Sequence, residues 1–289
     1  MKLIRRAWTV EQQGNVHVVR MQAGSKWSQK LYLMSDVHFD HADCDIKLLK
    51  RHLEDAAAEN ALIFFNGDTL DLMQARNDPR SSFDALRPEF KVIDYVNAVL
   101  DEAEKLLGPY AENIVFIGHG NHETSYRKHH SFDTVTALVD RINTKRKAHV
   151  QVGGYGGWVR LMVNAWKTET HSVRMKYFHG GGGGGIMSFG TLDTRRQASY
   201  IPDADIIWQG HTHDGYVLAA QRERLSDANV VSQKVQWHLR SPSYKDEYRD
   251  GSSGWAVERK QPPKPLGCIV GEMTAERKAI GLSFRLEVR

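Results

Sequence analysis

Three short apolar runs, over residues 31–34, 61–65 and 114–117, mark the first half of the chain. Runs of this length without polar interruption are typical of strands buried on both faces, as in a parallel sheet. Between them, apolar residues recur at helical spacing over 46–56 and over 90–107. This alternation of strands and helices predicts an α/β fold.

The second half of the chain changes to a period of two. Apolar and polar residues alternate over 159–163, 173–177 and 231–239, which predicts half-buried antiparallel strands. Six consecutive glycines, 180–185, interrupt this region. They form either a flexible linker or a stretch that lets a substrate, or a mobile lid, approach the backbone closely.

The two ends of the chain are less regular. Residues 1–30 predict a leading hairpin or an edge strand, and residues 241–289 a loop-rich C-terminal extension that closes with a strand over 280–288. Because we find neither an internal repeat nor a domain boundary, we expect one domain over residues 1–289.

Side chains that can bind metals follow five predicted strands, the four over 31–34, 61–65, 114–117 and 173–177 and a further short one over 205–208. In chain order they are Asp36 and His38, then Asp68, then Asn121 and His122, then His179, and finally His211 and His213. Ligand sites of open α/β sheets collect at the carboxyl ends of the strands. Residues i and i+2 of a strand point the same way, so Asp36 and His38 would hold one ion, as would His211 and His213 if extended.

The donor types indicate which ions fit. Carboxylates, imidazoles and an amide oxygen make a mixed N/O set without thiolate, which suits Mn, Fe, Zn, Co or Ni better than Ca or Mg. The Asp68 carboxylate has two oxygens and can bridge two cations. We therefore expect two divalent metal ions, with Mn favoured.

The motifs that carry these residues also resemble a known family. They are Asp36-x-His38, Gly67-Asp68, Gly120-Asn121-His122-Glu123, His179-Gly180 and Gly210-His211-x-His213. In this order they look like the motif set of the calcineurin-like metallophosphoesterases, over about residues 31–213. The resemblance implies a four-layer α/β/β/α sandwich with two mixed β-sheets and a dinuclear site at one edge of them.

The resemblance also implies a role for each residue. One metal would be held by Asp36, His38, Asp68 and His213, and the other by Asp68, Asn121, His179 and His211. His122 would face the substrate phosphate and act on the leaving oxygen. We expect Asp71 either to orient His122 or a metal ligand, or to be an exposed acid at a helix start.

The implied activity is metal-dependent hydrolysis of phosphoesters. In such sites a hydroxide that bridges two metals attacks phosphorus in line. Related protein serine/threonine phosphatases have an arginine where this chain has Leu72, and that arginine suits a phosphomonoester. We therefore expect a phosphodiesterase, with a phosphomonoesterase as the alternative and a non-catalytic scaffold of the same fold as a further one.

One departure from the family pattern leaves no residue assigned to the leaving-group side of the pocket. Many family members have a second histidine two residues after the one that matches His179, where this chain has Gly181. The tail over 241–248, together with 262–267, is similar to small phosphoesterases encoded by phages and prophages.

Charge bears on the substrate. The 289 residues carry a net charge of +4, with a sequence pI near 8.9, and a basic run lies over 141–147. We expect a nucleotide or nucleic acid as substrate, which would make the enzyme a nuclease. The candidate substrate-binding residues are Arg127, His130, Arg195 and Arg196, which are otherwise ordinary surface residues.

Composition bears on the compartment. The two cysteines, Cys44 and Cys268, lie far apart in the sequence and look like reduced thiols. No stretch approaches the roughly 20 apolar residues that span a membrane, and no signal-peptide core follows the basic N-terminus. We expect a cytoplasmic protein.

Overall fold

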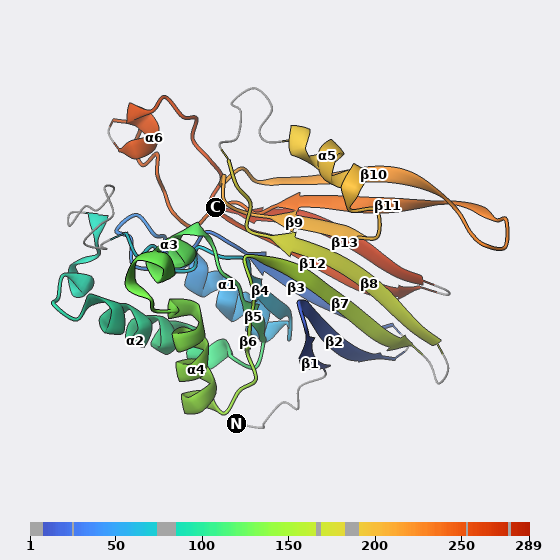
Figure 1. Ribbon diagram of the computed structural model, residues 1–289, viewed down its shortest axis with the longest axis horizontal. Coiled ribbons are helices and arrows are strands. Elements are labelled where there is room, and N and C mark those ends of the chain that lie inside the picture. Colours follow the sequence, from blue (N-terminus) through green and yellow to red (C-terminus); the bar gives the residue numbers. More distant parts are fainter. Residues whose placement is uncertain are drawn as a thin grey trace.

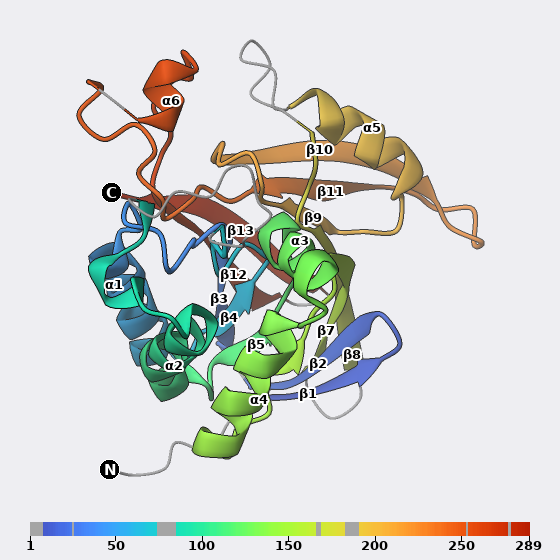
Figure 2. The same ribbon diagram turned by 60° about the vertical axis from the view of Figure 1, so that its left-hand side comes forward.

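Two β-sheets stacked face to face form the centre of the molecule in the computed structural model (Figure 1). The structure describes residues 8–24, 26–73, 85–165, 169–182, 191–252, 254–276 and 279–289, without the side chains of Ala165, Arg195 and Trp255. Helices lie on the outer faces of the sheets, as the view in Figure 2 shows.

The six-stranded sheet has the order β13-β12-β3-β4-β5-β6. Strands β3 to β6 are parallel, and β12 and β13 join them in antiparallel pairing, so the sheet is mixed. Every residue of β4 and β5 is buried, as expected for strands covered on both faces. The strand bounds are β3 Ser28–Met34, β4 Leu62–Phe65, β5 Ile114–Ile117, β6 Gln151–Val152, β12 Gly267–Glu276 and β13 Ala279–Val288.

The seven-stranded sheet has the order β1-β2-β7-β8-β9-β11-β10 and is also mixed. Strands β1 and β2 form an antiparallel hairpin, and β2 then pairs in parallel with β7. The strand bounds are β1 Trp8–Gln13, β2 Val16–Ala23, β7 Gly156–Ala165, β8 Glu169–Phe178, β9 Ile206–Gln209, β10 Tyr216–Leu225 and β11 Val231–Arg240.

The helices complete four layers. One apolar core lies between the six-stranded sheet and helices α1, α2 and α4, a second lies between the sheets, and a small third lies at α5. This arrangement confirms the α/β/β/α prediction. Among the described residues, no helix is both long and apolar enough to cross a membrane. The helix bounds are α1 Ile46–Ala58, α2 Tyr95–Leu107, α3 Asn121–His130, α4 Thr134–Arg146, α5 Leu192–Tyr200 and α6 Trp255–Glu258, with 3-10 turns η2 Pro88–Phe90 and η3 Gly108–Tyr110.

The predicted helix over 90–107 is shorter than expected. Phe90 is buried, but it belongs to the 3-10 turn η2, and α2 begins only at Tyr95. Ile93, which the helical spacing assigned to the buried face, is fully exposed. The spacing was therefore misleading over its first turn, because Phe90 reaches the core from a separate turn.

The short strand β6 and the long strands β10 and β12 were not predicted. Strand β10 pairs with β11, and β12 pairs with both β3 and β13. The residues from Gly267 onward thus lie mainly in two strands of the six-stranded sheet. Strand β13 matches the predicted strand over 280–288, and β12 occupies part of the segment expected to be loop-rich. Between them and β11, residues 241–266 contain only the single turn α6 as regular structure in the part that is described.

Candidate metal centre

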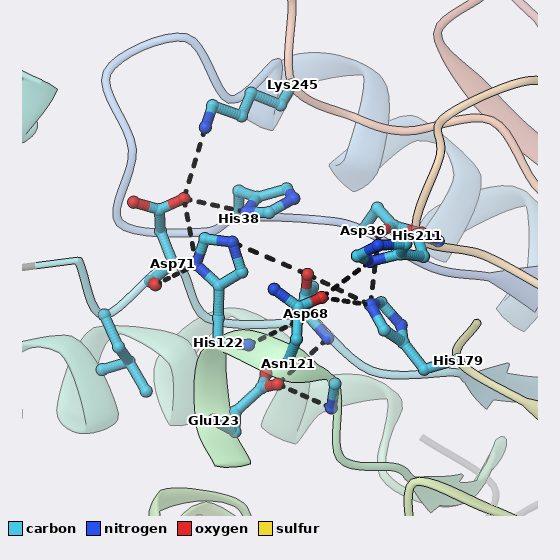
Figure 3. Close-up of polar contacts among 12 residues, drawn as sticks. Asp36, His38, Asp68, Asp71, Asn121, His122, Glu123, His179, His211 and Lys245 are labelled. Carbon is cyan, nitrogen blue, oxygen red and sulfur yellow. Dashed lines mark hydrogen bonds and ion pairs between the residues drawn. The ribbon is translucent and has the colours of Figure 1, made fainter. Parts of the chain in front are cut away.

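The metal-binding side chains foreseen from the sequence gather where β3, β4, β8 and β9 end and where α3 begins. Most of the cluster can be followed in Figure 3, where side chains from these separate segments point toward Asp68. The seven candidate ligands are Asp36, His38, Asp68, Asn121, His179, His211 and His213.

A first group consists of Asp36, His38 and His213, and we call it the first metal group. The Nε2 atoms of His38 and His213 are 3.3 Å apart, and His213 Nε2 is 3.4 Å from Asp36 Oδ1. One ligand atom of each residue lies within 4.8 Å of the others, so one ion could contact all three. All three side chains are buried.

A second metal group consists of Asp68, His179 and His211. His179 Nε2 is 3.2 Å from Asp68 Oδ2. The Asn121 side-chain oxygen joins this group, 3.0 Å from His179 Nε2 and 2.8 Å from His211 Nδ1. Since Asp68 also forms a third cluster with His38 and His122, its carboxylate lies between the two groups.

The backbone at these residues is not the extended strand that the i, i+2 argument assumed. Asp36, His38, Asp68, His211 and His213 all have positive φ angles, between 47° and 72°. The prediction that extended i and i+2 residues hold one ion is therefore wrong about the backbone conformation. The side chains converge because tight left-handed turns follow the strands, and His211 and His213 consequently belong to different groups.

Glycines allow these turns to pack together. A Cβ added at Gly120 would collide with the Asp68 carboxylate, and one at Gly210 would collide with Ser35 Oγ and Asp36 Oδ2. Both glycines precede candidate ligands in the motifs, so close backbone approach explains their presence.

Asp71 and His122 lie at the edge of the first metal group. The Asp71 carboxylate accepts a hydrogen bond from His38 Nδ1 at 2.8 Å, and its main-chain oxygen accepts one from His122 Nδ1. Asp71 is therefore buried and not an exposed helix-start acid. With Nδ1 engaged, His122 turns Nε2 toward Asp68 Oδ2, 3.7 Å away.

Two buried acids accept hydrogen bonds from the backbone of the turns around Asp68 and Asp71. Glu123 accepts hydrogen bonds from the backbone N–H groups of Asp68, Leu70 and Gly120 at 2.8–3.1 Å. Asp40 accepts from the N–H groups of Asp71 and Leu72 at 2.7 and 3.1 Å. The sequence did not predict this supporting role for either acid. Glu123 stood inside a motif, but Asp40 resembled an ordinary loop residue.

The cluster concentrates negative charge. Burial alone would raise the pKa of Asp36 and Asp68, but attraction to His179 and other imidazoles lowers them, Asp36 to about 2 and Asp68 well below its usual value. Burial would likewise lower the pKa of His179, yet Asp68 and Asp36 raise it to about 10. Each carboxylate therefore favours a cation beside it.

The donor set fits metal ions. Asp36 and Asp68 are 0% and 2% exposed, and neither forms an ion pair with lysine or arginine within the described parts of the chain. Buried carboxylates require paired charge. Imidazoles and one amide oxygen surround them, which is the donor chemistry of Mn, Fe or Zn. These residues would hold two divalent ions.

Two functional candidates from the C-terminal region escaped sequence reasoning. Lys245 Nζ is 3.4 Å from Asp71 Oδ1, and Glu247 Oε2 is 3.2 Å from His213 Nδ1. A pocket lined by these residues, Tyr248 and Lys264, among others, borders His213. No sequence motif predicted them, because a single lysine and a single glutamate in a loop form no recognisable spacing pattern.

The side chains of Arg127, His130 and Arg196 are described, and the contacts of Arg127 and His130 lie outside the metal groups. Arg127 is about half exposed and pairs with Asp133 at 3.4 Å, while the His130 ring stacks on Tyr126. Arg196 is exposed on α5, and the Arg195 side chain lies outside the described residues. The structure therefore does not bring Arg127 or His130 into contact with the metal groups.

The basic run over 141–147 is largely engaged within the fold. Arg141 pairs with Asp101 at 2.6 Å, and Lys145 and Arg146 each contact Glu104 at 2.9 Å. These pairs join α4 to α2. Since the acids offset much of its charge, the run is a weaker argument for a polyanionic substrate than its sequence suggested.

Comparison with known proteins identifies a related family. The family model for calcineurin-like phosphoesterases matches residues 29–215. No curated protein matches the chain.

The solved structures that match this chain share little sequence with it. A predicted phosphoesterase from Streptococcus pneumoniae TIGR4 is 14% identical, with 90% of each chain covered and a TM-score of 0.34. Vps29 from Entamoeba histolytica, complexed with zinc, is 10% identical over 89% of this chain and 99% of its own, with a TM-score of 0.35. GAP50 of Plasmodium, an anchor in the inner membrane complex, is 11% identical over 90% of this chain and 84% of its own, with a TM-score of 0.38.

Proposed function

Because this chain belongs to the calcineurin-like phosphoesterase family, we propose that it is a metal-dependent phosphodiesterase that acts on nucleotides or nucleic acid. The observation that carries this proposal is the convergence of Asp36, His38 and His213 with Asp68, His179 and His211 in two adjoining groups. Two divalent ions bound there would polarise the phosphoryl oxygens and supply a nucleophile from water at neutral pH.

The chain's own residues have separate tasks in this proposal. Asp68 lies between the two groups and would contact both ions. His122 donates its Nδ1 proton to the Asp71 main chain, which leaves Nε2 facing the reaction site. As an imidazolium, with a proton on each ring nitrogen, His122 would give its Nε2 proton to the leaving oxygen, the usual task of a general acid.

The surroundings of Asp71 favour a diester over a monoester. Leu72, the next residue, is buried and apolar, so it provides no cation for a doubly charged phosphoryl group. Lys245 does reach Asp71, but it lies between that carboxylate and Glu247, at 3.4 and 3.7 Å. Because these two acids balance the charge of Lys245, it would contribute little to the binding of a monoester dianion.

A comparison of two model substrates tests this function. With the Mn-loaded protein, we expect a higher kcat/KM for bis-p-nitrophenyl phosphate than for p-nitrophenyl phosphate. Asp68→Asn should abolish hydrolysis of both and reduce the bound Mn, because it removes the negative charge of the shared carboxylate and replaces one of its two oxygens with an amide nitrogen. Asp203→Asn, at an exposed position, is the matched control and should retain activity.

Two outcomes would contradict the proposal. A preference for the monoester would make the protein a phosphatase, and full activity of Asp68→Asn would place hydrolysis outside this cluster. A panel of mononucleotide, dinucleotide and polynucleotide esters then narrows the substrate. Cleavage of a polynucleotide should weaken steeply with added salt, since phosphate contacts release counterions.

A further inference from the structure

We propose that Glu247 is a positioning residue for the first metal group and makes its ion the more tightly held of the two. This inference rests on the proposed metal site and extends it. It involves a segment beyond residues 29–215, the part matched by the family model. We call residues 241–247 the C-terminal strap.

The strap is anchored directly behind the first metal group. Ser243 Oγ and the Tyr244 N–H both donate to the main-chain oxygen of Asp36, at 2.8 and 3.0 Å. Ser241 Oγ donates to the main-chain oxygen of Leu33 at 2.9 Å, and the Tyr244 side chain is fully buried. Anchored at these points, the strap offers a rigid support for the two residues at its end.

Glu247 orients one imidazole of the first metal group. Its Oε2 lies 3.2 Å from His213 Nδ1, and a carboxylate can only accept at this contact. The Nδ1 of His213 must therefore carry the proton. That assignment leaves Nε2, which lies beside Asp36 and His38, as the nitrogen that would bind an ion.

His38 is held in the same way by a different carboxylate. Its Nδ1 donates to Asp71 Oδ1 at 2.8 Å, leaving Nε2 for the ion. Lys245 lies between the two acids, 3.4 Å from Asp71 Oδ1 and 3.7 Å from Glu247 Oε1. The Lys245 ammonium group thus offsets the repulsion between the Asp71 and Glu247 carboxylates, which accept hydrogen bonds from the two imidazoles.

The second metal group lacks this arrangement at His179. The Nδ1 of His179 donates to the main-chain oxygen of Asn66 at 2.8 Å, which is a neutral acceptor. A carboxylate partner makes an imidazole a stronger ligand than a neutral partner does. Since both imidazoles of the first metal group have carboxylate partners, that group should hold its ion more tightly.

Titration of the metal-free full-length protein with Mn²⁺ alone tests the inference. Isothermal titration calorimetry should resolve two equivalents of unequal affinity. We expect Glu247→Ala to weaken the tighter equivalent roughly 10- to 100-fold and to leave the weaker one unchanged. Glu247→Gln keeps an acceptor without the charge and should have an intermediate effect. Glu258→Gln, an exposed glutamate on α6, is the matched control.

The outcomes separate this inference from the proposed function. If Glu247→Ala binds both equivalents as the unaltered protein does, weakens both equally, or weakens only the looser one, the positioning role is wrong while the metal site stands. If the unaltered protein binds no Mn²⁺, the proposed function fails as well. The thermal unfolding midpoint of Glu247→Ala is the measure that excludes a general loss of fold.

Discussion

At the scale of single residues, the site depends on backbone conformations that most side chains avoid. Left-handed residues other than glycine cost on the order of 1 kcal/mol or more each, and persist only when neighbours hold them in place. Here hydrogen bonds between turns do so: the Asp36 N–H donates to Gly67 O at 3.1 Å, and the His38 N–H donates to Asp68 O at 2.9 Å. The first two motifs therefore stabilise each other's geometry.

His122 provides the sharpest test at this scale. His122→Ala should lower kcat by about 10²- to 10⁴-fold, because it removes the proton donor for the leaving oxygen. Both metal equivalents should remain bound, since neither metal group needs this imidazole to be complete. Hydrolysis of bis-p-nitrophenyl phosphate and metal analysis of the purified variant measure the two effects.

His129→Ala is the matched control, because His129 is exposed on the same helix and lies outside the cluster. It should change neither kcat nor metal content. Loss of one metal equivalent in His122→Ala would instead make His122 a ligand, which would contradict its assignment as a proton donor.

At the scale of elements, the candidate ligands lie just after strands and at the start of one helix. β4 and β5 have only four residues each, yet they are fully buried and fix the turns that follow them. Helix α3 begins at Asn121, so Asn121 and His122 project from its first turn. Rigid elements thus end where the candidate ligands begin, which favours a preorganised site.

The apolar pattern predicted the elements that are buried on a regular face. The strands over 61–65 and 114–117 and the helix over 46–56 match β4, β5 and α1 closely. Helix α3 gave no such signal, because its buried residues are the polar His122 and Glu123. In β12, Gly271 interrupts the apolar run, and the Phe284 ring occupies the place of its side chain.

The residues of the candidate site also divide into those that a sequence pattern predicted and those that it did not. Residues within short motifs, such as Asp36 and His38, could be proposed from the sequence because their types and spacing carry the chemistry. Lys245 and Glu247 could not, since only the packing of the strap behind Asp36 brings them to the cluster. Tertiary contacts of this kind leave no local pattern.

Glu123 links α3 to the turn after β4, which makes it a test at this scale. Its carboxylate accepts from three backbone N–H groups, and glutamine would retain only one acceptor oxygen. Glu123→Gln should therefore lower the free energy of unfolding by about 1–3 kcal/mol. Urea denaturation measures this change.

Glu54→Gln provides the comparison, because Glu54 is exposed on α1 and its replacement should alter stability by less than about 0.5 kcal/mol. Equal stability of the two variants would show that the buried carboxylate does not join α3 to the site.

At the scale of the whole molecule, the core between the sheets joins the two halves of the fold. His17, on β2, lies in this core: its ring stacks on Phe116 of β5 with 4.9 Å between centroids, and its Nε2 is 3.3 Å from the Tyr177 hydroxyl of β8. Burial lowers the pKa of His17 from 6.5 to about 4, because the charged imidazolium loses its hydration there. His17 is therefore neutral in the folded protein near neutral pH.

This buried imidazole makes the fold sensitive to acid. The unfolded chain takes up a proton at His17 near its usual pKa of 6.5, whereas the folded protein resists until about 4. The stabilisation is thus complete above 6.5 and is lost as the pH falls toward 4. Between about pH 7 and pH 5, this group alone should lower the free energy of unfolding by about 2 kcal/mol.

Urea denaturation of the metal-free protein across this range measures the effect. His17→Gln cannot take up the proton, so its free energy of unfolding should fall less between about pH 7 and pH 5 than that of the unaltered protein, by about 2 kcal/mol. His149→Gln, at an exposed position, should follow the unaltered protein. Because the comparison is between slopes, a uniform loss of stability in His17→Gln does not affect it. Parallel curves for all three proteins would mean that water reaches His17 and that the core between the sheets is less tightly closed than its packing indicates.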